Sequence, residues 1–485
     1  MKHAKTIILL TSSYALLALA SAAQAGYIPV YGGPVYDAAT GTGLWYVAES
    51  IVNEAGTAVV TGLEYVGGMP LAPRAWRWDP WGAIPRQLGD LGTSGSGEMQ
   101  VFAYAINSAG TIVGTVDKYM PGSAMGWRAV RWDASGTVAT ELGNLGTDAA
   151  GVTNAEARGI NSAGTAVGFA EKYVQGFCTG FRAVRWHASG TAATELGHLG
   201  TDASGQTSGY ALAINDSGTA VGAAAKYVGG TYMGRVAIRW EGWGTAATEL
   251  GHLGTDSSGH TLAEALHINA AGTAVGRAYK YVDGTRVGDV AVRWEATGTA
   301  ATELGNLGTD ASGQALAYPY GINDAGTAVG ESRKYVGGSD MGIRAVRWDA
   351  SGTGAVELGN LGTDAAGYTK AWAEALNNAG TAVGFARLYV GGTYIGQRAV
   401  YWGLDGAAVD LNDLIDPSGG WTLNYAQDIS DTDWITGYGS FDPDGPGGLG
   451  PYQRAFLMQI PEPCTLGLLS AAALAAMLSR RRFAR

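Results

Sequence analysis

Residues 105–110 read Ala-Ile-Asn-Ser-Ala-Gly, and this phrase returns along the chain at a constant step. Its asparagine recurs every 54 residues, at Asn53, Asn107, Asn161, Asn215, Asn269, Asn323 and Asn377. A tryptophan keeps the same step, at Trp78, Trp132, Trp186, Trp240, Trp294, Trp348 and Trp402. Degenerate copies of the two phrases, at 429–437 and 454–457, add an eighth repeat unit. Self-similarity at a period of this length is typical of a protein built from repeated structural units.

Each unit contains four short apolar runs separated by turn residues. Runs a and b are seen at 128–132 and 140–143, run d at 165–174 and run c at 210–214. Gly, Asn, Asp and Ser bound the runs, as in Asp133-Ala134-Ser135-Gly136. Short β-branched or aromatic runs bounded in this way indicate strands, and the body sustains no helical period of 3.6 residues. The body is therefore predicted to be all-β.

Four antiparallel strands per unit make one blade of a β-propeller, and 54 residues is close to the usual blade length of roughly 40–50 residues. The chain begins in mid-unit, near Pro34, and finishes with run a at 454–459. The last strand can then complete the first blade and remove an open sheet edge. Eight units fill the 432 residues from Val30 to Pro461. We predict an eight-bladed propeller within residues 26–460, closed by the C-terminal strand. Seven blades with an extra hairpin, and an open array, are the alternatives.

The N-terminus has the three parts of a secretory signal peptide. Lys2 and Lys5 form its positive start, residues 7–20 are apolar, and Ala23-Gln24-Ala25 is a small-x-small cleavage site. We expect residues 1–25 to be removed, which leaves Gly26 as the first mature residue.

The C-terminus carries a second segment with the features of a targeting signal. Pro461-Glu462-Pro463 precedes an apolar run at 464–478, and the basic cluster Arg480-Arg481-Arg482 follows it. The run is shorter than the roughly 20 residues of a comfortable membrane span, and the arginines would hold the C-terminus in the cytoplasm. Residues 461–485 therefore read as a short transmembrane segment that contacts the membrane before processing.

This tail closely resembles the PEP-CTERM sorting signal of exported bacterial proteins, in which Pro-Glu-Pro, a hydrophobic helix and arginines stand in the same order. The resemblance implies recognition and cleavage by an exosortase, a membrane cysteine enzyme similar to transpeptidases. It also implies a host that makes exopolysaccharide. The alternative is a plain C-terminal membrane anchor.

The repeat also resembles the HAF family of bacterial extracellular repeats. The matching residues are Glu-Leu-Gly-Asn-Leu-Gly at 141–146, Ala-Ile-Asn-Ser-Ala-Gly at 105–110 and the closing Asp-Leu-Asn-Asp-Leu-Ile at 410–415. The resemblance covers nearly the whole mature chain and implies export and a repeat fold. It implies no activity and supplies no catalytic residue.

Charge and composition exclude several classes of protein. The 485-residue chain has a formal net charge of -11, which argues against nucleic-acid binding because that function requires a basic surface. Cys178 and Cys464 are the two cysteines, and the second lies in the tail, so a disulfide framework is not expected. The 77 glycines follow no period of three, which excludes collagen.

The histidines form no metal-binding or catalytic motif. His198 and His252 take the place of Asn144, Asn306 and Asn360 in sister units, which favours a turn hydrogen bond over a ligand role. A ring of Gly-Thr-Asp turns could bind Ca²⁺, but one acid per turn favours Asx turns in which the carboxylate bonds to nearby N–H groups. These aspartates are Asp148, Asp202, Asp256, Asp310 and Asp364. We expect no cofactor, with Ca²⁺ as the alternative.

Charged residues also repeat beside the tryptophans. Arg131 precedes Trp132, Glu141 lies on the next run, and both recur in sister units. We predict an ion pair between these two runs in each blade, and we assign the tryptophan to packing between strands.

Residues that vary between copies are where ligand specificity must lie, because the fold accounts for the repeated ones. The b–c and d–a connections vary, and in a four-stranded blade they emerge on one face of the disc, whereas the a–b and c–d turns emerge on the other. Binding residues often lie on loops held by a rigid scaffold. We therefore name a candidate binding face made of aromatic side chains: Trp127, Phe177, Phe181, Tyr232 and Tyr394. Drift in exposed loops is the alternative explanation of this variation.

The sequence thus predicts a non-catalytic exported protein of the cell envelope, cell surface or extracellular matrix. Its expected partners are the secretion machinery, exosortase, and exopolysaccharide or another surface partner. The alternative is a propeller enzyme, a polysaccharide hydrolase or lyase, which requires a blade-unique cluster of acids, His or Tyr. Only scattered candidates are visible in the sequence: His187, His260, His267 and Tyr318.

Overall fold

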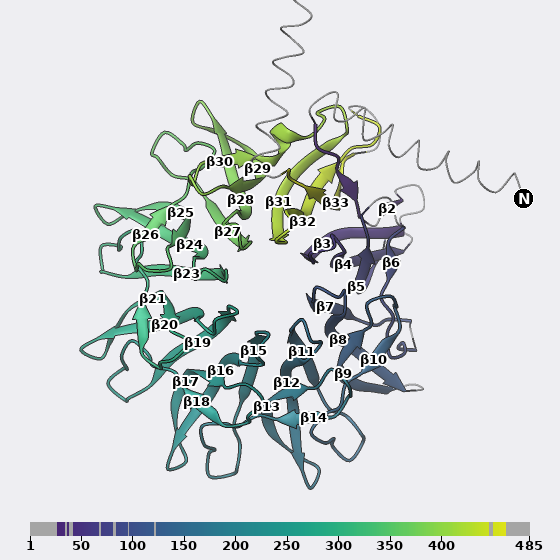
Figure 1. Cartoon of the computed structure of the whole chain (residues 1–485), viewed down its shortest axis with the longest axis vertical. Helices are drawn as coiled ribbons and strands as arrows, with labels where there is room; N and C mark the ends of the chain where they lie inside the picture. The colour runs from purple at the N-terminus through teal and green to yellow at the C-terminus, as the bar shows by residue number, and fades with distance from the viewer. Residues whose placement is uncertain are drawn as a thin grey trace, which may run out of the picture.

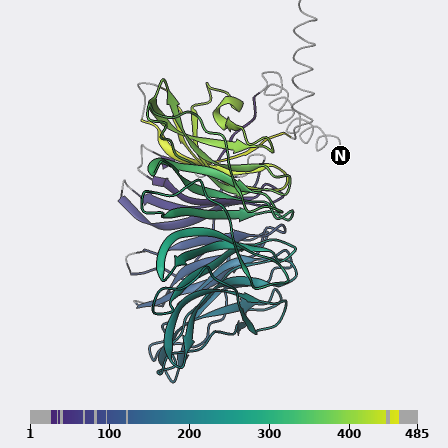
Figure 2. The same ribbon diagram turned by 90° about the vertical axis from the view of Figure 1, so that its left-hand side faces the viewer.

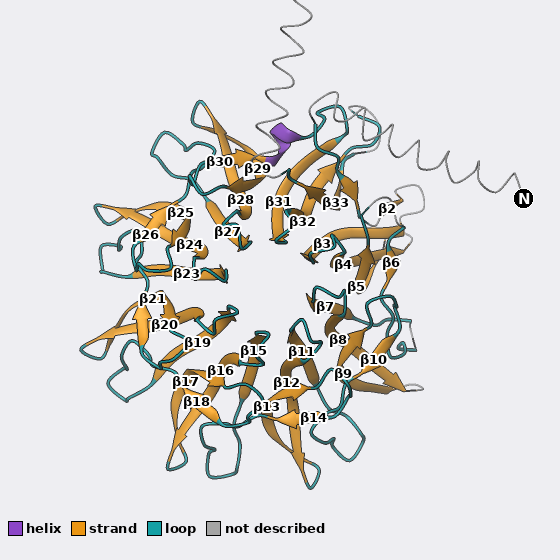
Figure 3. Cartoon of the chain, in the orientation of Figure 1, coloured by secondary structure: helices purple, strands orange, loops and turns teal. Residues whose placement is uncertain are grey.

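The computed structural model describes residues 27–33, 36–37, 42–66, 69–80, 84–95, 97–120, 123–445 and 450–461. They form a disc of antiparallel sheets arranged around a central axis (Figure 1), which Figure 2 shows from its edge. Almost all regular structure is strand (Figure 3), and the short 3-10 helix η1 spans Leu411–Leu414. The predicted all-β, eight-bladed propeller is confirmed.

Each blade contains four strands, which follow one another from the axis outward. Blade 1 contains β3 (Thr42–Val52), β4 (Ala58–Val66), β5 (Met69–Trp78) and β6 (Arg86–Gln87), and the short β2 (Tyr36–Asp37) pairs with β3. Blade 2 contains β7 (Val101–Ile106), β8 (Ile112–Met120), β9 (Ser123–Trp132) and β10 (Ala139–Glu141). Blade 3 contains β11 (Ala155–Ile160), β12 (Ala166–Val174), β13 (Phe177–Trp186) and β14 (Ala193–Glu195). Blade 4 contains β15 (Gly209–Ile214), β16 (Ala220–Val228), β17 (Thr231–Trp240) and β18 (Ala247–Glu249).

The second half of the disc repeats this plan. Blade 5 contains β19 (Thr261–Ile268), β20 (Ala274–Val282), β21 (Thr285–Trp294) and β22 (Ala301–Glu303). Blade 6 contains β23 (Ala315–Ile322), β24 (Ala328–Val336), β25 (Ser339–Trp348) and β26 (Ala355–Glu357). Blade 7 contains β27 (Ala371–Leu376), β28 (Ala382–Val390), β29 (Thr393–Trp402) and β30 (Ala408–Asp410). Blade 8 contains β31 (Trp421–Ile429), β32 (Trp434–Phe441), β33 (Tyr452–Gln459) and β1 (Tyr31–Gly32).

The ring closes in blade 8, where the N-terminal strand joins the C-terminal strand. Tyr31 pairs with Leu457 and Gly32 pairs with Phe456. The prediction that the last strand completes the first blade is therefore wrong in this detail. The four runs follow the order c, d, a, b from the axis outward, so β5 continues directly from β4 and blade 1 is complete by itself. The strand that blade 8 lacks is run b, and β1 supplies it.

The core lies between neighbouring blades. In the cluster around Trp294, Val221 and Ala237 come from blade 4 and Ala263 and Ala265 from blade 5, and all five are fully buried. The small alanines let the sheets approach closely. The indole N–H of Trp294 donates to the carbonyl of Gly251 at 2.9 Å, which ties blade 5 to blade 4. The same bond recurs at Trp132, Trp186, Trp240, Trp348 and Trp402. The packing role predicted for the tryptophans is therefore confirmed.

The repeated asparagines form a second set of bonds between blades. In each case the buried side-chain amide donates to the backbone carbonyl of the equivalent residue one blade later. These asparagines are Asn53, Asn107, Asn161, Asn215, Asn269 and Asn323, with distances of 3.1–3.2 Å. Asn377 continues the series to Ser430, and Thr432 closes it by donating to the carbonyl of Glu54 at 2.7 Å. The ring of bonds fixes the c–d turns around the axis.

The ion pair predicted between Arg131 and Glu141 is wrong. Arg131 lies opposite Thr140 in the β9–β10 register, so its side chain and that of Glu141 point to opposite sides of the sheet. Arg131 instead donates to the carbonyl of Ala188 in the next blade, at 3.1 Å. Glu141 pairs with Lys118 at 2.6 Å and with Arg128 at 3.1 Å.

The predicted division of loops between the two faces is confirmed. The b–c residue Thr153 donates its N–H to the carbonyl of the d–a residue Met125 at 3.2 Å. On the other face, Arg239 reaches the c–d turn at Gly272 and the a–b turn at Ala296, at 3.3 and 2.9 Å.

Candidate functional site

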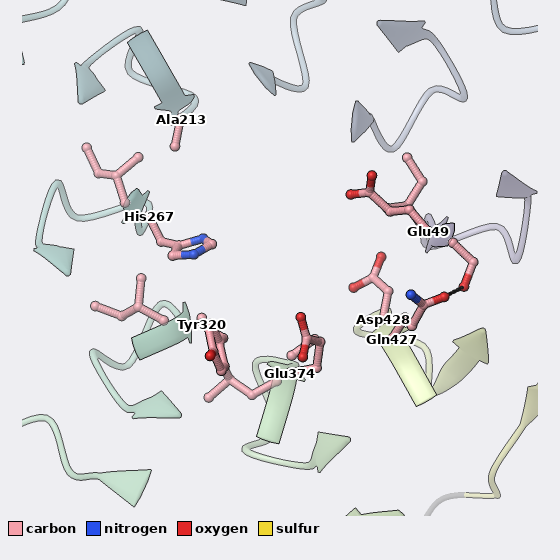
Figure 4. A pocket seen from close by; sticks show the side chains of 14 residues that line it. Glu49, Ala213, His267, Tyr320, Glu374, Gln427 and Asp428 are labelled. Carbon is pink, nitrogen blue, oxygen red and sulfur yellow. Dashed lines mark hydrogen bonds between the residues drawn. The ribbon is translucent and has the colours of Figure 1, made fainter. Parts of the chain in front are cut away.

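Polar side chains that vary from blade to blade gather around the axis of the disc. They line a cavity of about 370 Å³, shown in Figure 4, and they come from the innermost strands of blades 1, 5, 6, 7 and 8. The polar lining residues are Glu49, Ser50, His267, Tyr320, Glu374, Gln427 and Asp428. His267 lies across the cavity from Glu49 and Asp428 (Figure 4).

A β-bulge in the innermost strand helps to place these residues. In β19 the register shifts between Ala265 and His267, so the strand carries one residue more than its partner β20 at this point. The facing residue is Gly276, where an added Cβ would lie 1.9 Å from the carbonyl oxygen of Glu264. The same close approach occurs at Gly114, Gly168, Gly222, Gly330, Gly384 and Gly437. A repeated glycine thus permits a bulge that presents variable residues to the axis.

The positions beside the bulge differ from blade to blade. Three residues before the repeated asparagine, or before Ser430 in blade 8, the chain has Ser50, Tyr104, Arg158, Leu212, Leu266, Tyr320, Glu374 and Gln427. One residue later it has Ile51, Ala105, Gly159, Ala213, His267, Gly321, Ala375 and Asp428. Glu374 of blade 7 and Asp428 of blade 8 stand at these positions, and Glu49 of blade 1 stands one residue before Ser50. The acidic side chains of the lining thus come from blades 7, 8 and 1, where the symmetry of the repeat is broken.

Glu374 is held by two residues that do not line the cavity. Its carboxylate accepts a hydrogen bond from the Tyr425 hydroxyl, and that hydroxyl accepts one from the Trp372 indole N–H at 2.7 Å. Burial raises the pKa of Glu374 above its usual value, and the Tyr425 bond opposes the rise. The carboxyl is thereby fixed in position and weakened as an acid.

A second carboxyl lies behind Tyr320. Glu331 is buried on β24, with 6% of its surface exposed. Burial raises the pKa of Glu331 to about 7, while a side-chain bond with Tyr320 opposes the rise and the charge of Glu374 adds to it. Burial likewise raises the pKa of the Tyr320 hydroxyl. Tyr320 therefore stays a neutral phenol over the physiological pH range.

Asp428 lies where blade 8 meets blade 1. Its two oxygens accept the backbone N–H groups of Val52 and Ile429, each at 2.9 Å. Burial raises the pKa of Asp428 to about 7, and the neighbouring Glu54 and Glu49 add to the rise against these two bonds. Gln427 adjoins it, accepting from the Ser50 hydroxyl at 2.9 Å and donating to the carbonyl of Ala48 at 3.1 Å.

The other polar groups near the axis complete the electrostatics of the cavity. Burial lowers the pKa of His267 to about 4, so its imidazole is neutral at pH 7. Burial raises the pKa of Glu49, the positive charge of Arg158 opposes this, and Glu374 reinforces it. Arg158 lies over the Tyr104 ring at 4.1 Å and pairs with Glu156 at 2.5 Å. Hydroxyl, amide, imidazole and carboxyl groups thus surround one cavity, which suits hydrogen bonding to a polar ligand.

The structure places the five predicted aromatic residues on four different blades. Trp127, Phe177, Tyr232 and Tyr394 have exposed fractions of 43%, 76%, 46% and 49%. Phe181 is half-buried and packs edge-on against Phe169 at 5.3 Å. No ring contact joins any two of the five within the described chain. The predicted face exists, but these side chains do not form one patch on it.

The four residues considered as enzyme candidates also lie in different places in the structure. Of the four, His267 lies in the axial cavity. Tyr318 donates to Asp289 at 2.9 Å between blades 6 and 5, and His260 contacts Asp256 within its own turn at 3.3 Å. His187 bonds to Ser189 at 2.8 Å in an exposed a–b turn.

The Gly-Thr-Asp turns are Asx turns, as the ligand count favoured. Asp148 Oδ1 accepts the N–H groups of Ala150 and Val152 at 2.9 and 2.8 Å. Equivalent bonds occur at Asp202, Asp256, Asp310 and Asp364. Among the described residues, no three His, Cys, Asp or Glu side chains are grouped to hold a metal ion. His252 accepts the N–H of Gly254 at 3.2 Å, the turn bond that Asn306 makes to Gly308.

Most of the terminal sites lie outside the described residues. These are Ala23, Ala25 and Gly26 of the cleavage site and Glu462, Pro463, Arg480, Arg481 and Arg482 of the sorting signal. Pro461 is the last described residue and follows β33. Over the described ranges, no helix has the length and apolar character to cross a membrane.

Sequence reasoning missed Glu49, Tyr320, Glu374, Gln427 and Asp428. The signal that could have found them is the variation between copies just before the repeated asparagine. Variation in the loops is easier to see. The innermost strand is mostly apolar in every copy, so it was interpreted as core and its few polar residues were overlooked.

No protein-family model and no curated protein matches the chain. Among solved structures, it is similar to the β-propeller domain of the Trilobed protease from Pyrococcus furiosus, at 9% identity, over 77% of this chain and 97% of that chain, with a TM-score of 0.41. It is also similar to the GH74 xyloglucanase from Xanthomonas campestris, at 11% identity, over 88% of this chain and 67% of that chain, with a TM-score of 0.40. A puromycin hydrolase matches at 13% identity, over 77% of this chain and 52% of that chain, also with a TM-score of 0.40. At these identities the resemblance concerns the propeller fold alone.

Proposed function

We propose that this chain is a non-catalytic, exported surface or matrix protein that binds polysaccharide in its axial cavity. The observation that carries the proposal is the convergence on that cavity of polar side chains that vary between blades, while the repeated asparagines and tryptophans are used in packing and blade-to-blade bonds.

The chemistry of the cavity supports a hydroxyl-rich ligand. Tyr320, Gln427 and neutral His267 can each donate or accept a hydrogen bond, and the Glu374 carboxyl can accept one. Rigid placement favours such binding, and the Tyr425 bond fixes Glu374. The ligand class also agrees with the resemblance to PEP-CTERM proteins, whose hosts make exopolysaccharide.

Export and sorting remain part of the proposal. Residues 1–25 resemble a signal peptide and 461–485 resemble an exosortase signal. We expect the body to reach the cell envelope, the cell surface or the extracellular space, with the secretion machinery and exosortase as its partners on the way.

Binding to the producing organism's own exopolysaccharide tests this function. Glu374→Gln and Tyr320→Phe should each weaken binding at least tenfold in isothermal titration, whereas Tyr232→Ala and Tyr394→Ala on the loop face should leave it unchanged. A loss confined to the loop-face variants would move the site to that face. No binding by the unmodified chain would reject the function.

One observation favours a polysaccharide hydrolase or lyase as a second candidate. Glu49, Glu374 and Asp428 line one cavity, and paired carboxyls with separated pKa values perform glycoside hydrolysis. Incubation with the polymer should release reducing or unsaturated ends if this is correct, and Glu374→Gln should abolish the release. Intact polymer after incubation with the unmodified chain would leave binding as the function.

A further inference from the structure

A second cavity of about 330 Å³ adjoins the axial cavity on the side of the c–d turns. Its lining includes the turn residues Asp216, Asp324 and Asp431. Ile268, Ile322 and Leu376 line both cavities. Along each innermost strand, the residues before the repeated asparagine line the inner cavity and those at the turn line the outer one. The two cavities are therefore successive levels of one channel that opens on the c–d face.

The shape of the channel sets the kind of ligand it fits, because its two levels of about 370 and 330 Å³ follow one another along the axis. Each level alone falls within the range of roughly 300–1,000 Å³ that ordinary ligand pockets occupy. A ligand that fills both levels is elongated along the axis. A chain of sugar units meets this requirement because successive units can lie at successive levels.

The outer level cannot spread apart to admit a ligand sideways. The amide of Asn269 donates to the carbonyl of Asn323 at 3.1 Å, and the amide of Asn323 donates to that of Asn377 at 3.2 Å. Asn378 adds bonds to Asp324 and Asp431 at 3.0 and 2.7 Å. The asparagine-to-carbonyl bonds of this ring are buried and therefore costly to break, whereas the Asn378 bonds are exposed. A saccharide chain must accordingly enter lengthwise by one of its ends.

The charge of the channel excludes acidic ligands. Glu54, Asp216, Asp324 and Asp431 lie at the outer level, and Glu49, Glu374 and Asp428 lie at the inner one. Within the described part of the chain, neither lining contains a lysine or an arginine. A carboxylate or sulfate on the ligand would meet acidic side chains at both levels, with no lysine or arginine among the described lining residues to pair with, which is unfavourable.

We infer that the channel binds one end of a linear saccharide chain without acidic groups, taken up lengthwise from the c–d face. The inference rests on the proposed function, and it adds that the protein recognises chain ends rather than segments within the chain. One end of a saccharide chain then occupies one protein molecule.

Titration with oligosaccharides of graded length tests this. The probe is a size-fractionated partial hydrolysate of the producing organism's exopolysaccharide, titrated into the full chain. The number of protein molecules bound per oligosaccharide should stay constant as length increases, and oxidation of primary hydroxyls to carboxylates should weaken binding at least tenfold. A number that rises with length, or unchanged affinity after oxidation, would overturn the inference and leave the binding function standing. Failure of every fraction to bind would reject the binding function itself.

Variants at the two levels test the route of entry. Leu376→Trp narrows the channel where the levels meet. Asp324→Arg places a bulky side chain at the mouth, and the bonds to Asn378 and to the Ala270 N–H that it removes are solvent-exposed. Val390→Trp on the d–a hairpin of blade 7, exposed at 61%, is the control. The mouth variant should lose at least tenfold in affinity, and the control should not. Binding by Asp324→Arg as tight as that of the control would contradict lengthwise entry from this face, whatever the stability of Leu376→Trp.

Discussion

The side-chain amide of Asn53 donates a hydrogen bond of 3.1 Å to the backbone carbonyl of Asn107, which occupies the same place one blade later. The Asn53 oxygen meanwhile accepts the N–H groups of Ala55 and Thr57 in its own turn, at 3.1 and 2.9 Å. One side chain thus caps its own hairpin and holds the next blade. The period of 54 residues in the sequence is also the period of this bond.

Replacing a ring asparagine by aspartate should destabilise the disc. Asn161→Asp keeps an acceptor for the N–H of Thr165 but loses the donor to the carbonyl of Asn215, which stands 3.2 Å away. An unpaired buried carbonyl costs about 1–3 kcal/mol. Urea unfolding should show a loss of that order. Asn144→Asp is the matched control, because Asn144 accepts the N–H of Gly146 through its oxygen. Equal stability of the two variants would refute the role of the ring.

The glycine that faces each bulge should not tolerate a methyl group. A Cβ at Gly276 would lie 1.9 Å from the carbonyl oxygen of Glu264, so Gly276→Ala forces the strands apart. We expect a loss of about 1–3 kcal/mol, the usual cost of overpacking. Gly298→Ala in the same blade is the control, because no atom of the described residues lies within 4 Å of its added Cβ. Thermal unfolding of both variants measures the difference, and coincident transitions would count against the bulge.

A buried tryptophan should matter far more than an exposed one. Trp294→Phe removes the bond to the Gly251 carbonyl and leaves a cavity between blades 4 and 5. Together these changes should cost about 2–4 kcal/mol. Trp243→Phe, at a residue that is 57% exposed, should change the free energy of unfolding very little. Chemical denaturation of the two variants compares them directly, and similar losses would argue against packing as the role of the repeated tryptophan.

Asp428 should make stability depend on pH. Its pKa is raised to about 7 in the folded state, above the unfolded value near 3.9, so the folded state binds this proton more tightly. Its contribution is therefore fully present below about pH 4 and is lost as the pH rises through about 7. The free energy of unfolding of the unmodified protein, relative to Asp428→Asn, should fall between about pH 4 and pH 7. A difference that stays constant over this range would contradict the assignment.

The repeat made the fold predictable, because turn residues and β-branched runs mark every strand at a fixed step. Side-chain partners were harder to predict. Arg131 and Glu141 lie on strands that are adjacent in the sequence, yet the β9–β10 register places their side chains on opposite sides of the sheet. A register is fixed by pairing, and the composition of a run does not reveal it.

The candidate site could be predicted only in part. His267 was visible as an unusual residue, but its neighbours Tyr320 and Glu374 come from blades 6 and 7 and meet it only where the innermost strands of successive blades converge on the axis. The bulge adds to the difficulty, because one extra residue in each innermost strand shifts which side chains face the axis. A prediction that assumes strict alternation of side chains between the two faces of a strand therefore assigns these residues to the wrong face.

Closure between blades 8 and 1 is what assembles the candidate site, because Glu49, Ser50, Gln427 and Asp428 enter one cavity only if these blades are neighbours. Thr432 donates to the carbonyl of Glu54 across this junction at 2.7 Å. The most direct test is Glu54→Cys combined with Thr432→Cys, in a chain with Cys178→Ser and Cys464→Ser, treated with a short bis-maleimide and analysed by mass spectrometry. We predict a cross-link within one chain that forms in the folded protein and is lost when urea precedes the reagent. A cross-link that forms only between chains would contradict the closed disc.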